Sequence, residues 1–522
     1  MAVPPDAMTG STTGLPPGRF GLADVLAEHR RGRPRSPAVV DGGTRLTYAQ
    51  LDARVGRLAA ALAGRGVGRG DRILWLGQNS FRVLEVLLAA ARLGAVVCPA
   101  NWRQSADELA FVLQDLEPAV VLWQELELGE LVREVRARDA ARAHWLQHDG
   151  DGADSYEALV AGGPEQAKYV AGTGQDPVLG LYTVAADGRS HAALLSHAGL
   201  IAQGMVISHT HEVTDASVCL DSAPFFHVAS FMLAIATLVR GGLNVVTRRA
   251  DGVAMCEAID RERCTHALIF PPTLETMRDV ARGGHYDLST LWSTPDLSDR
   301  PTTMLTPLSA PWARRPGGYG QTEVGGLVTF NALGPPGEGG FGRPSPVTAL
   351  RIVDEHDEEV ATGDVGEISI RGLTVMTGYH RRPELNALRA RGGWHHTGDL
   401  GRRHADGTLT FVGPKTRMIK SGAENVYPTE VESCVAGHPA VAAVCVIGVP
   451  DPRWTQTVRA VVVPSGAVTE EELIEYCRGR IASYKKPRSV VFTDALPRTP
   501  RGDVDRDAVD TRFDGGGYPG AG

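Results

Sequence analysis

The feature that most constrains this chain is a regular alternation of helix-like and strand-like segments that begins near residue 20. Apolar residues at helical spacing over 51–62 predict an amphipathic helix that ends at Gly64. An apolar run at 71–76 predicts a buried strand, which is followed by an expected helix at 81–93 and strand at 95–99. Because such alternation is typical of βαβ units, we expect a mostly parallel sheet flanked by helices.

The pattern continues along the chain and then changes. We expect further strands at 119–122, 178–182, 243–246 and 267–270. After residue 325, short strands separated by Gly and Pro, such as 349–353 and 366–370, indicate a smaller β-rich subdomain. The segment 415–421 has the pattern of a hinge, and helices and strands alternate again beyond it.

These segments predict an α/β protein with two domains and two loose ends. The large N-terminal domain is expected at 20–414, with its mostly parallel sheets and the β-rich subdomain, and a small mobile α+β domain at 415–510. Residues 1–19 are rich in Pro, Gly, Ser and Thr and are expected to be a disordered leader. The Gly-rich 511–522 is expected to be a flexible tail.

Charge and cysteine usage exclude several classes of protein. The formal net charge is -8, which argues against a nucleic-acid partner. The seven cysteines form no C-x-x-C pair, as expected for reduced thiols in the cytoplasm. The N-terminus has no signal-peptide pattern, and no segment approaches the about 18 apolar residues of a membrane helix. We therefore expect a cytoplasmic protein without a membrane span, and the sequence carries no sign of its oligomeric state.

Five short blocks occur in a fixed order. They are Thr47-Tyr48, Tyr319-Gly320-Gln321-Thr322-Glu323, Thr397-Gly398-Asp399, the segment 418–432 (MIKSGAENVYPTEVE) and Leu496-Pro497-Arg498. Together they resemble the acyl-CoA synthetase branch of the adenylate-forming superfamily, over roughly residues 20 to 507. The resemblance implies an AMP-binding N-terminal domain that activates a small carboxylic acid, fatty or aromatic, with Mg-ATP through an acyl-adenylate. The small domain would then rotate and present a thiol, that of coenzyme A or of an acyl carrier protein.

The phosphate-binding loop of that family is altered in this chain. The resemblance aligns it with 182–192, where Thr183 and Gly188 are kept as nucleotide-binding residues. Asp187 adds a negative charge where a polyphosphate would lie, and His191 stands at the position of the family's lysine. Either the segment is a turn left from ancestry, or Arg189 and His191 bind phosphate in a new way.

The block at 319–323 is better preserved. The resemblance implies that Thr322 and Glu323 are catalytic, contact the α-phosphate and hold the magnesium ion. It also implies that Tyr319 stacks on adenine and that Gln321 belongs to the same nucleotide site. Attack on the α-phosphate develops charge on its oxygens, which explains the need for a metal there. The family's adenine-binding glycine segment is not recognisable at 292–298.

Asp399 matches the family aspartate that binds the ribose hydroxyls. A carboxylate suits this role because it can accept two O–H donors at once. The family's companion arginine is replaced by Pro414, and either Lys415 or Arg417 could take its place.

His227 aligns with an aromatic or histidine gate between the ATP and acyl sites of the family, and we count it among the catalytic candidates. The same residue is equally compatible with a buried core histidine. The apolar residues around it would line an acyl pocket or belong to the core: Phe225, Phe226, Val228, Phe231 and Met232.

The C-terminal lysine of the family, which reaches the carboxylate and α-phosphate during adenylation, is Asp503 here. Loss of one transition-state donor typically costs about 10²–10³ in rate, and a charge reversal should cost more. Arg498 and Arg501 lie close in sequence and could compensate.

The part of the small domain that meets the thiol keeps the family pattern. The resemblance implies that Ser421 and Gly422 border the pantetheine arm of coenzyme A and that Trp454 packs on its adenine. Lys485 offers a cation for its phosphates, although the sequence is equally compatible with a solvent-exposed surface lysine.

Three functions follow from these residues. The first is an ATP-dependent carboxylic acid–CoA ligase with an altered phosphate site, which rests on Thr322, Glu323 and Asp399. The second is an ATP-independent transferase that moves an acyl group between thiols, because His191, Pro414 and Asp503 all fall on the adenylation side. The third is a non-catalytic binding homologue.

Overall fold

The computed structural model describes most of the chain. The described residues are 20–138, 143–152, 155–164, 173–184, 190–269, 271–291, 304–415, 417–422, 424–499 and 503–517. The helices are α1 (Leu22–Gly32), α2 (Tyr48–Ala63), α3 (Phe81–Leu93), α4 (Ala106–Leu116), α5 (Glu125–Arg138), α6 (Tyr156–Gly162), α7 (His197–His211), α8 (Val228–Arg240), α9 (Gly252–Glu262), α10 (Pro271–Arg282), α11 (Pro311–Arg314), α12 (Pro383–Arg389), α13 (Pro428–Ala436), α14 (Glu470–Arg478) and α15 (Arg506–Arg512). Within the described ranges, none of these helices has the length and apolar character needed to cross a membrane.

Two mixed sheets form the large N-terminal part. The first has the order β19-β8-β7-β4-β3-β5-β6, and its strands from β7 to β6 run parallel. Its strands are β3 (Arg72–Leu76), β4 (Val96–Pro99), β5 (Val120–Trp123), β6 (His144–Gln147), β7 (Pro177–Val184), β8 (Ser190–Ser196) and β19 (Gly378–Tyr379). The predicted mostly parallel architecture is confirmed, and β8 and β19 extend the sheet with antiparallel pairs.

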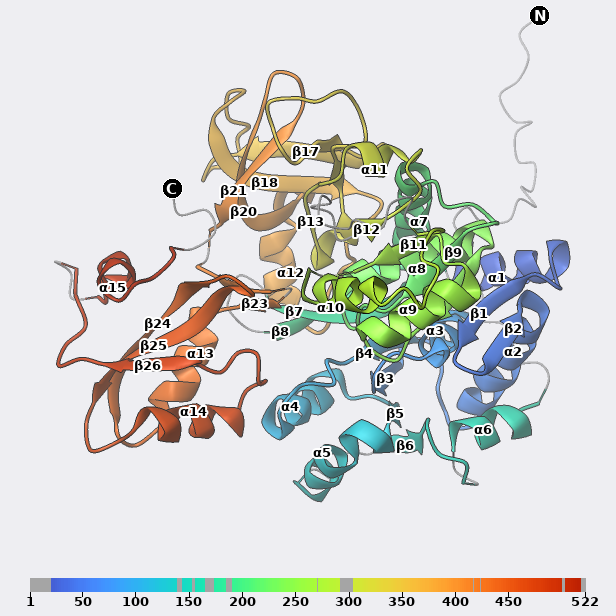
Figure 1. The fold of residues 1–522 in the computed structure, drawn as a ribbon, viewed down its shortest axis with the longest axis horizontal. Coiled ribbons are helices and arrows are strands. Elements are labelled where there is room, and N and C mark those ends of the chain that lie inside the picture. Colours follow the sequence, from blue (N-terminus) through green and yellow to red (C-terminus); the bar gives the residue numbers. More distant parts are fainter. Residues whose placement is uncertain are drawn as a thin grey trace, which may run out of the picture.

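The second sheet has the order β12-β11-β9-β10-β1-β2, with a parallel centre and antiparallel edges. Its strands are β1 (Pro37–Asp41), β2 (Thr44–Thr47), β9 (Val218–Asp221), β10 (Leu243–Val246), β11 (His266–Leu268) and β12 (Met304–Leu305). Figure 1 shows the helices of the large part packed around and between these sheets.

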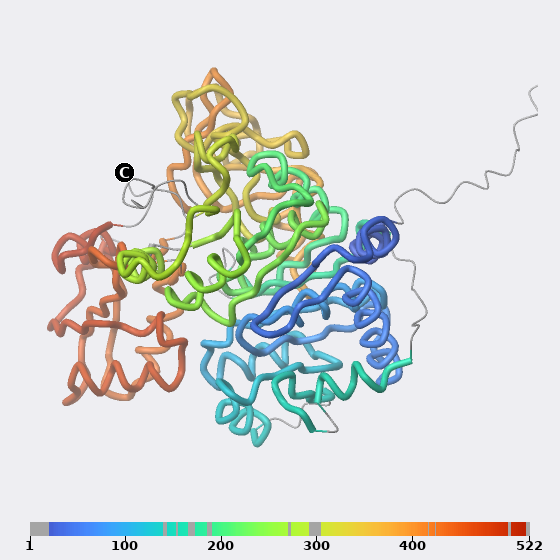
Figure 2. Tube along the Cα trace, turned by 45° about the vertical axis from the view of Figure 1, so that its right-hand side comes forward, coloured from blue at the N-terminus to red at the C-terminus, as the bar shows by residue number. Residues whose placement is uncertain are grey.

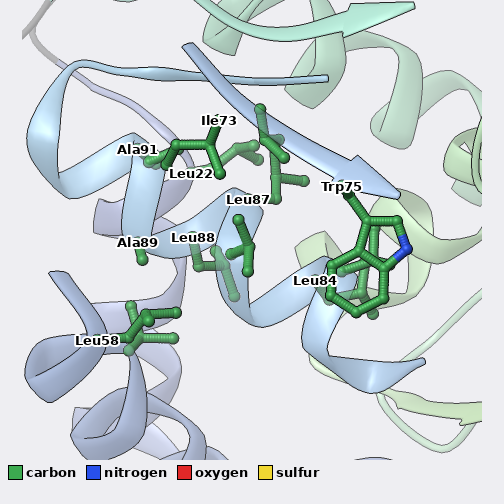
Figure 3. Close-up of a cluster of buried hydrophobic side chains, with 14 of the residues drawn as sticks. Leu22, Leu58, Ile73, Trp75, Leu84, Leu87, Leu88, Ala89 and Ala91 are labelled. Atoms are coloured by element: carbon green, nitrogen blue, oxygen red, sulfur yellow. The ribbon is translucent and has the colours of Figure 1, made fainter. Parts of the chain in front are cut away.

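The core of the large part forms around α3. The side chain of Ser80 accepts a hydrogen bond from the helix start, and Gly94 ends the helix with a φ of 68°. Between these caps almost every residue of α3 is apolar and buried. Figure 3 shows leucines of α3 packed between Leu58 of α2 and the side chains of Ile73 and Trp75 on β3.

A β-rich subdomain follows, as predicted. Its antiparallel sheet β17-β18-β20-β21 comprises β17 (Thr348–Val353), β18 (Val365–Gly372), β20 (His395–Arg403) and β21 (Leu409–Pro414). Two short hairpins precede it: β13 (Gly320–Gln321) with β14 (Gly326–Leu327), and β15 (Thr329–Phe330) with β16 (Arg343–Pro344).

The C-terminal part has its own sheet, helices and core. Strands pair in the order β23-β22-β25-β24, and β26 adds to β25 in parallel. The strands are β22 (Ile419–Ser421), β23 (Glu424–Val426), β24 (Val441–Asp451), β25 (Thr455–Pro464) and β26 (Ser489–Phe492). Figures 1 and 2 both show this part, coloured orange to red, standing to one side of the large part. The β22–β23 hairpin lies on the side that faces the large part, close to β7 in Figure 1.

Candidate functional site

A cavity of about 520 Å³ lies where the β-rich subdomain, the turn after β13 and the C-terminal hairpin meet. Its lining combines aromatic, acidic and basic side chains with several glycines. The lining residues are Thr183, Val184, Val228, Gly318, Tyr319, Gly320, Gln321, Thr322, Glu323, Leu327, Phe341, Arg389, Thr397, Gly398, Asp399, Phe411, Pro414, Met418, Lys420, Asn425 and Tyr427. The structure thus brings together residues from three of the sequence blocks that lie far apart along the chain.

Asp399 sits at the centre of a hydrogen-bond cluster in this cavity. The Tyr319 hydroxyl donates to Asp399 Oδ2 at 2.6 Å, and the Gln321 amide donates to the same oxygen at 3.2 Å. Burial raises the pKa of Asp399, and the Tyr319 bond works against that rise. Tyr319 itself is buried, with its ring 5.6 Å from that of Phe411. Its hydroxyl therefore orients Asp399, and its stacking on adenine stays a prediction.

Thr322 and Glu323 lie on a short 3₁₀ turn that ends at Gly325, whose φ of 75° suits glycine. Glu323 is 5% exposed, and its Oε1 accepts a hydrogen bond from the Tyr379 hydroxyl at 2.8 Å. Burial raises the pKa of the Glu323 carboxyl. A magnesium ion commonly binds through one or two carboxylates plus substrate phosphates, so this donor set fits the ion.

The phosphate-loop residues divide between the cavity and the surrounding sheet. Thr183 lines the cavity, whereas Gly188 and Arg189 lie outside the described residues, as does Asp187. His191 is buried, and its Nδ1 accepts a hydrogen bond from Arg382 Nε at 3.1 Å. Because β7 and β8 pair Thr183 with His191, the two side chains belong to one hairpin. The imidazole lies against Arg382 and the Tyr379 ring, 5.7 Å away between centroids.

A smaller cavity of about 170 Å³ adjoins the first and shares with it Thr183, Val184, Thr322, Asn425 and Tyr427. His227 lines it from the start of α8, so the histidine and Thr322 face the same cavity. Of the apolar residues around it, Phe226 lines the smaller cavity and Val228 the larger one. Phe225, Phe231 and Met232 belong to the packed core.

Glu424 joins the C-terminal hairpin to the large part. Its Oε1 lies 2.7 Å from Arg103 Nη2 and 3.3 Å from His227 Nε2. Burial alone would raise the pKa of Glu424, but His227 and Arg103 hold it below its usual value. The hairpin is therefore docked on the large part through a charged contact beside both cavities.

Ser421 and Gly422 form the turn of this hairpin and lie beside Trp454. The Gly422 amide donates to the Trp454 carbonyl at 2.7 Å. A Cβ at Gly422 would lie 3.1 Å from the indole ring, and the φ of 62° also favours glycine there. The guanidinium groups of Arg453 and Arg488 lie 5.0 and 5.4 Å from the ring centroid of Trp454. Trp454 thus sits in a basic environment.

Lys485 is 8% exposed and lies between the two parts of the chain. Its ammonium is 2.7 Å from Glu108 on α4 and 2.6 Å from Glu430 on α13. Burial favours the neutral amine, yet Tyr484 and the two carboxylates raise the pKa of Lys485 overall. In this arrangement the ammonium of Lys485 forms ion pairs with carboxylates on two helices. Its contact with coenzyme A phosphates stays a prediction.

Two of the positions at which the family has a cation, Pro414 and Asp503, differ in their surroundings. Pro414 lines the large cavity, whereas Lys415 pairs with Glu367 at 2.7 Å and Arg417 with Asp507 at 2.6 Å. The Asp503 carbonyl accepts a hydrogen bond from the Thr499 amide at 2.8 Å. Arg501 and the segment 292–298 lie outside the described residues.

Sequence reasoning did not single out four polar lining residues. Lys420 Nζ donates to the Asn425 side chain at 2.8 Å, and burial lowers the pKa of Lys420. Lys420, Asn425 and Tyr427 all lie inside the recognised block at 418–432, which was the available signal. Arg389, at the end of α12, lies in no recognised motif, and no sequence signal pointed to it.

Comparison with known proteins agrees with this geometry. The family model described as AMP-binding enzyme matches residues 26–380, and the AMP-binding enzyme C-terminal domain matches residues 430–503. A feruloyl-CoA synthase of Amycolatopsis sp is 35% identical, with 94% of this chain and 99% of the relative covered. An indoleacetate–CoA ligase of Aromatoleum aromaticum is 34% identical, with 94% and 97% covered.

Among solved structures, the amide bond synthetase McbA from Marinactinospora thermotolerans superposes with a TM-score of 0.79 at 25% identity, covering 95% of this chain and 100% of that one. The fold, the order of the blocks and the extent of these matches all agree. The chain therefore belongs to the AMP-binding enzyme family, in its acyl-CoA synthetase branch.

Proposed function

We propose that this protein is an AMP-forming carboxylic acid–CoA ligase that makes an acyl-adenylate from Mg-ATP and passes the acyl group to coenzyme A. The observation that carries this proposal is the convergence of Asp399, Glu323 and two hairpin residues, Lys420 and Asn425, on one cavity of about 520 Å³. That volume is in the range of a small-molecule site.

The nucleotide is proposed to occupy the part of the cavity between Tyr319 and Asp399. Tyr319 and Gln321 both bond Oδ2 of Asp399, and among the described residues no donor is recorded for Oδ1. That oxygen is suited to accept the ribose hydroxyls. Glu323 and Thr322 would then lie beside the α-phosphate, with magnesium on Glu323. The bound ion supplies charge neutralisation for the phosphate oxygens.

The acid is proposed to bind at the apolar end of the cavity, near Val228 and Leu327. His227 would separate this end from the smaller cavity. The names of the two relatives above, feruloyl-CoA synthase and indoleacetate–CoA ligase, each specify an aromatic acid. We therefore propose an aromatic acid as the first substrate to test, with fatty acids as the second class.

The thiol is proposed to approach from the C-terminal part. The smaller cavity reaches Thr322 from beside His227, and the docked hairpin borders it with Glu424 and Asn425. Gly422 leaves room at the hairpin turn, and Trp454 with Arg453 and Arg488 would receive the adenine and phosphates of coenzyme A. On this view the domains are 20–414 and a mobile 415–510.

The adenylation half-reaction is proposed to be slow, since His191, Pro414 and Asp503 replace three cations of the family. A second candidate function is an ATP-independent transfer of an acyl group from one thiol to another. The observation that favours it is the docking of the hairpin beside the cavity, whereas Asp503 is not among the described residues that line it. We also propose a cytoplasmic location, because all seven cysteines are free thiols.

The deciding experiment measures pyrophosphate release with Mg-ATP and a panel of aromatic and fatty acids, with and without coenzyme A. Acid-dependent release that yields AMP and an acyl-CoA is the expected result. Release from no acid, together with acyl exchange between acyl-CoA and a carrier-protein or small thiol, would replace the ligase with the transferase. Asp399→Ala serves as the control, because it should abolish release without altering the smaller cavity.

A further inference from the structure

A buried arginine faces the proposed nucleotide site although no motif contains it. Arg389 is the last residue of α12, is 7% exposed and lines the large cavity. Its Nη1 donates to the His396 carbonyl at 2.6 Å, which fixes the guanidinium beside the strand that carries Asp399. A Cβ at Gly398 would lie 3.0 Å from Nη1, so the glycine leaves room for the guanidinium there.

The charge of Arg389 is not neutralised by direct contact. Within the described ranges, no carboxylate forms an ion pair with it, and its Nε is buried without a hydrogen-bond partner. Glu323 and Asp399 are nevertheless near enough for the guanidinium to lower their pKa values against the effect of burial. Burial and the same charge lower the pKa of His395 to about 3. A buried cation with a free donor and no ion partner is suited to bind an anionic ligand.

We propose that Arg389 binds the α-phosphate of the nucleotide and takes over part of the role of the cations missing at His191, Pro414 and Asp503. The proposal rests on the function proposed above. The α-phosphate joins the ribose, expected at Asp399, to the magnesium, expected at Glu323, and Arg389 acts electrostatically on both carboxylates. The planar fork of a guanidinium matches two phosphate oxygens at once, which a single ammonium cannot do.

The test compares the binding of AMP and adenosine by calorimetry, because the two differ only in the phosphate. Wild-type protein should bind AMP more tightly than adenosine. Arg389→Gln should weaken AMP binding by about 10- to 100-fold, the effect of losing hydrogen bonds to a charged group, and change adenosine binding by less than about 2-fold. Arg389→Lys keeps the charge without the fork and should weaken AMP binding by about 3- to 10-fold.

Arg391→Gln is the matched control. Arg391 follows α12 by two residues and pairs with Asp357 and Glu367 outside the cavity lining, so its loss should leave the preference for AMP intact. An equal loss of AMP and adenosine binding in Arg389→Gln would assign Arg389 a structural role and overturn the proposal. If that variant does not fold, unchanged AMP binding in Arg389→Lys would overturn it as well. Wild-type protein that binds neither compound would instead refute the proposed function, and the role of Arg389 with it.

Discussion

Removal of the Glu424 charge should separate the two half-reactions. Glu424→Gln keeps the size of the side chain but removes its ion pair with Arg103 at 2.7 Å and its contact with His227. Exposed ion pairs contribute about 0.2–1 kcal/mol, and breaking a fully buried pair costs about 3–5 kcal/mol. The Glu424 side chain is 13% exposed and that of Arg103 is 35% exposed, so the pair lies between these limits.

We therefore expect the docked orientation of the hairpin to lose about 1–2 kcal/mol, which is about 5- to 30-fold in the population of that orientation. Thioester formation from a presynthesised acyl-adenylate and coenzyme A should slow by the same factor. Pyrophosphate release is proposed to occur in a second orientation, before the small part rotates into the docked one, and it should not slow. The matched control is Glu125→Gln, which removes a 2.7 Å pair with Arg133 inside the large part.

The pH dependence of the thioester-forming rate is a second test of the Glu424 contact. The pKa of Glu424 is held below its usual value in the folded chain. The Glu424 charge therefore stabilises the docked hairpin fully above the pKa of the unfolded chain, about 4.3. This stabilisation is lost as the pH falls through the pKa that Glu424 has in the folded chain. The ratio of wild-type to Glu424→Gln thioester rates should therefore approach one in acid. Equal rates for the two proteins at neutral pH would refute the reasoning.

Three further predictions concern single side chains. Tyr319→Phe removes the 2.6 Å bond to Asp399 and should weaken adenosine binding by about 10-fold or more, since a hydrogen bond to a charged group contributes about 1.5–3 kcal/mol; unchanged affinity in calorimetry would contradict this. Gly422→Ala places a Cβ 3.1 Å from the Trp454 ring at a φ of 62°, so thermal or denaturant unfolding should show a loss of about 1–2 kcal/mol, and an unaltered midpoint would argue against this geometry. Asp503→Lys should raise pyrophosphate release by about 10-fold or more, whereas no increase would mean that other cations already suffice.

The sequence was most informative where local signals agree. The helix predicted at 81–93 is α3 (Phe81–Leu93), because Ser80 and Gly94 cap an almost wholly apolar segment. The strand predicted at 243–246 is β10 (Leu243–Val246) for a similar reason, a short apolar run after a glycine pair. The clustering of Tyr319, Thr322, Glu323 and Asp399 around one cavity followed from the resemblance and agrees with the structure.

Features set by distant partners could not be read from the sequence. The sequence offers Lys485 either for phosphates or as a surface lysine, but its observed partners include Glu108, which is separated from it by most of the chain. His191 was a candidate for phosphate binding, and its partner Arg382 comes from the segment before α12. The sequence does not predict Arg389 as a site residue, because α12 is short and polar and contains no motif.

The position of Lys485 makes this amine a reporter of domain rotation. One of its carboxylate partners, Glu108, belongs to the large part, and the other, Glu430, moves with the small part. If the small part rotates as proposed, Glu108 stays behind and the 8% exposed ammonium should be uncovered. Amine-reactive labelling followed by peptide mass spectrometry would then record, residue by residue, how much of the enzyme has left the docked orientation at each stage of turnover.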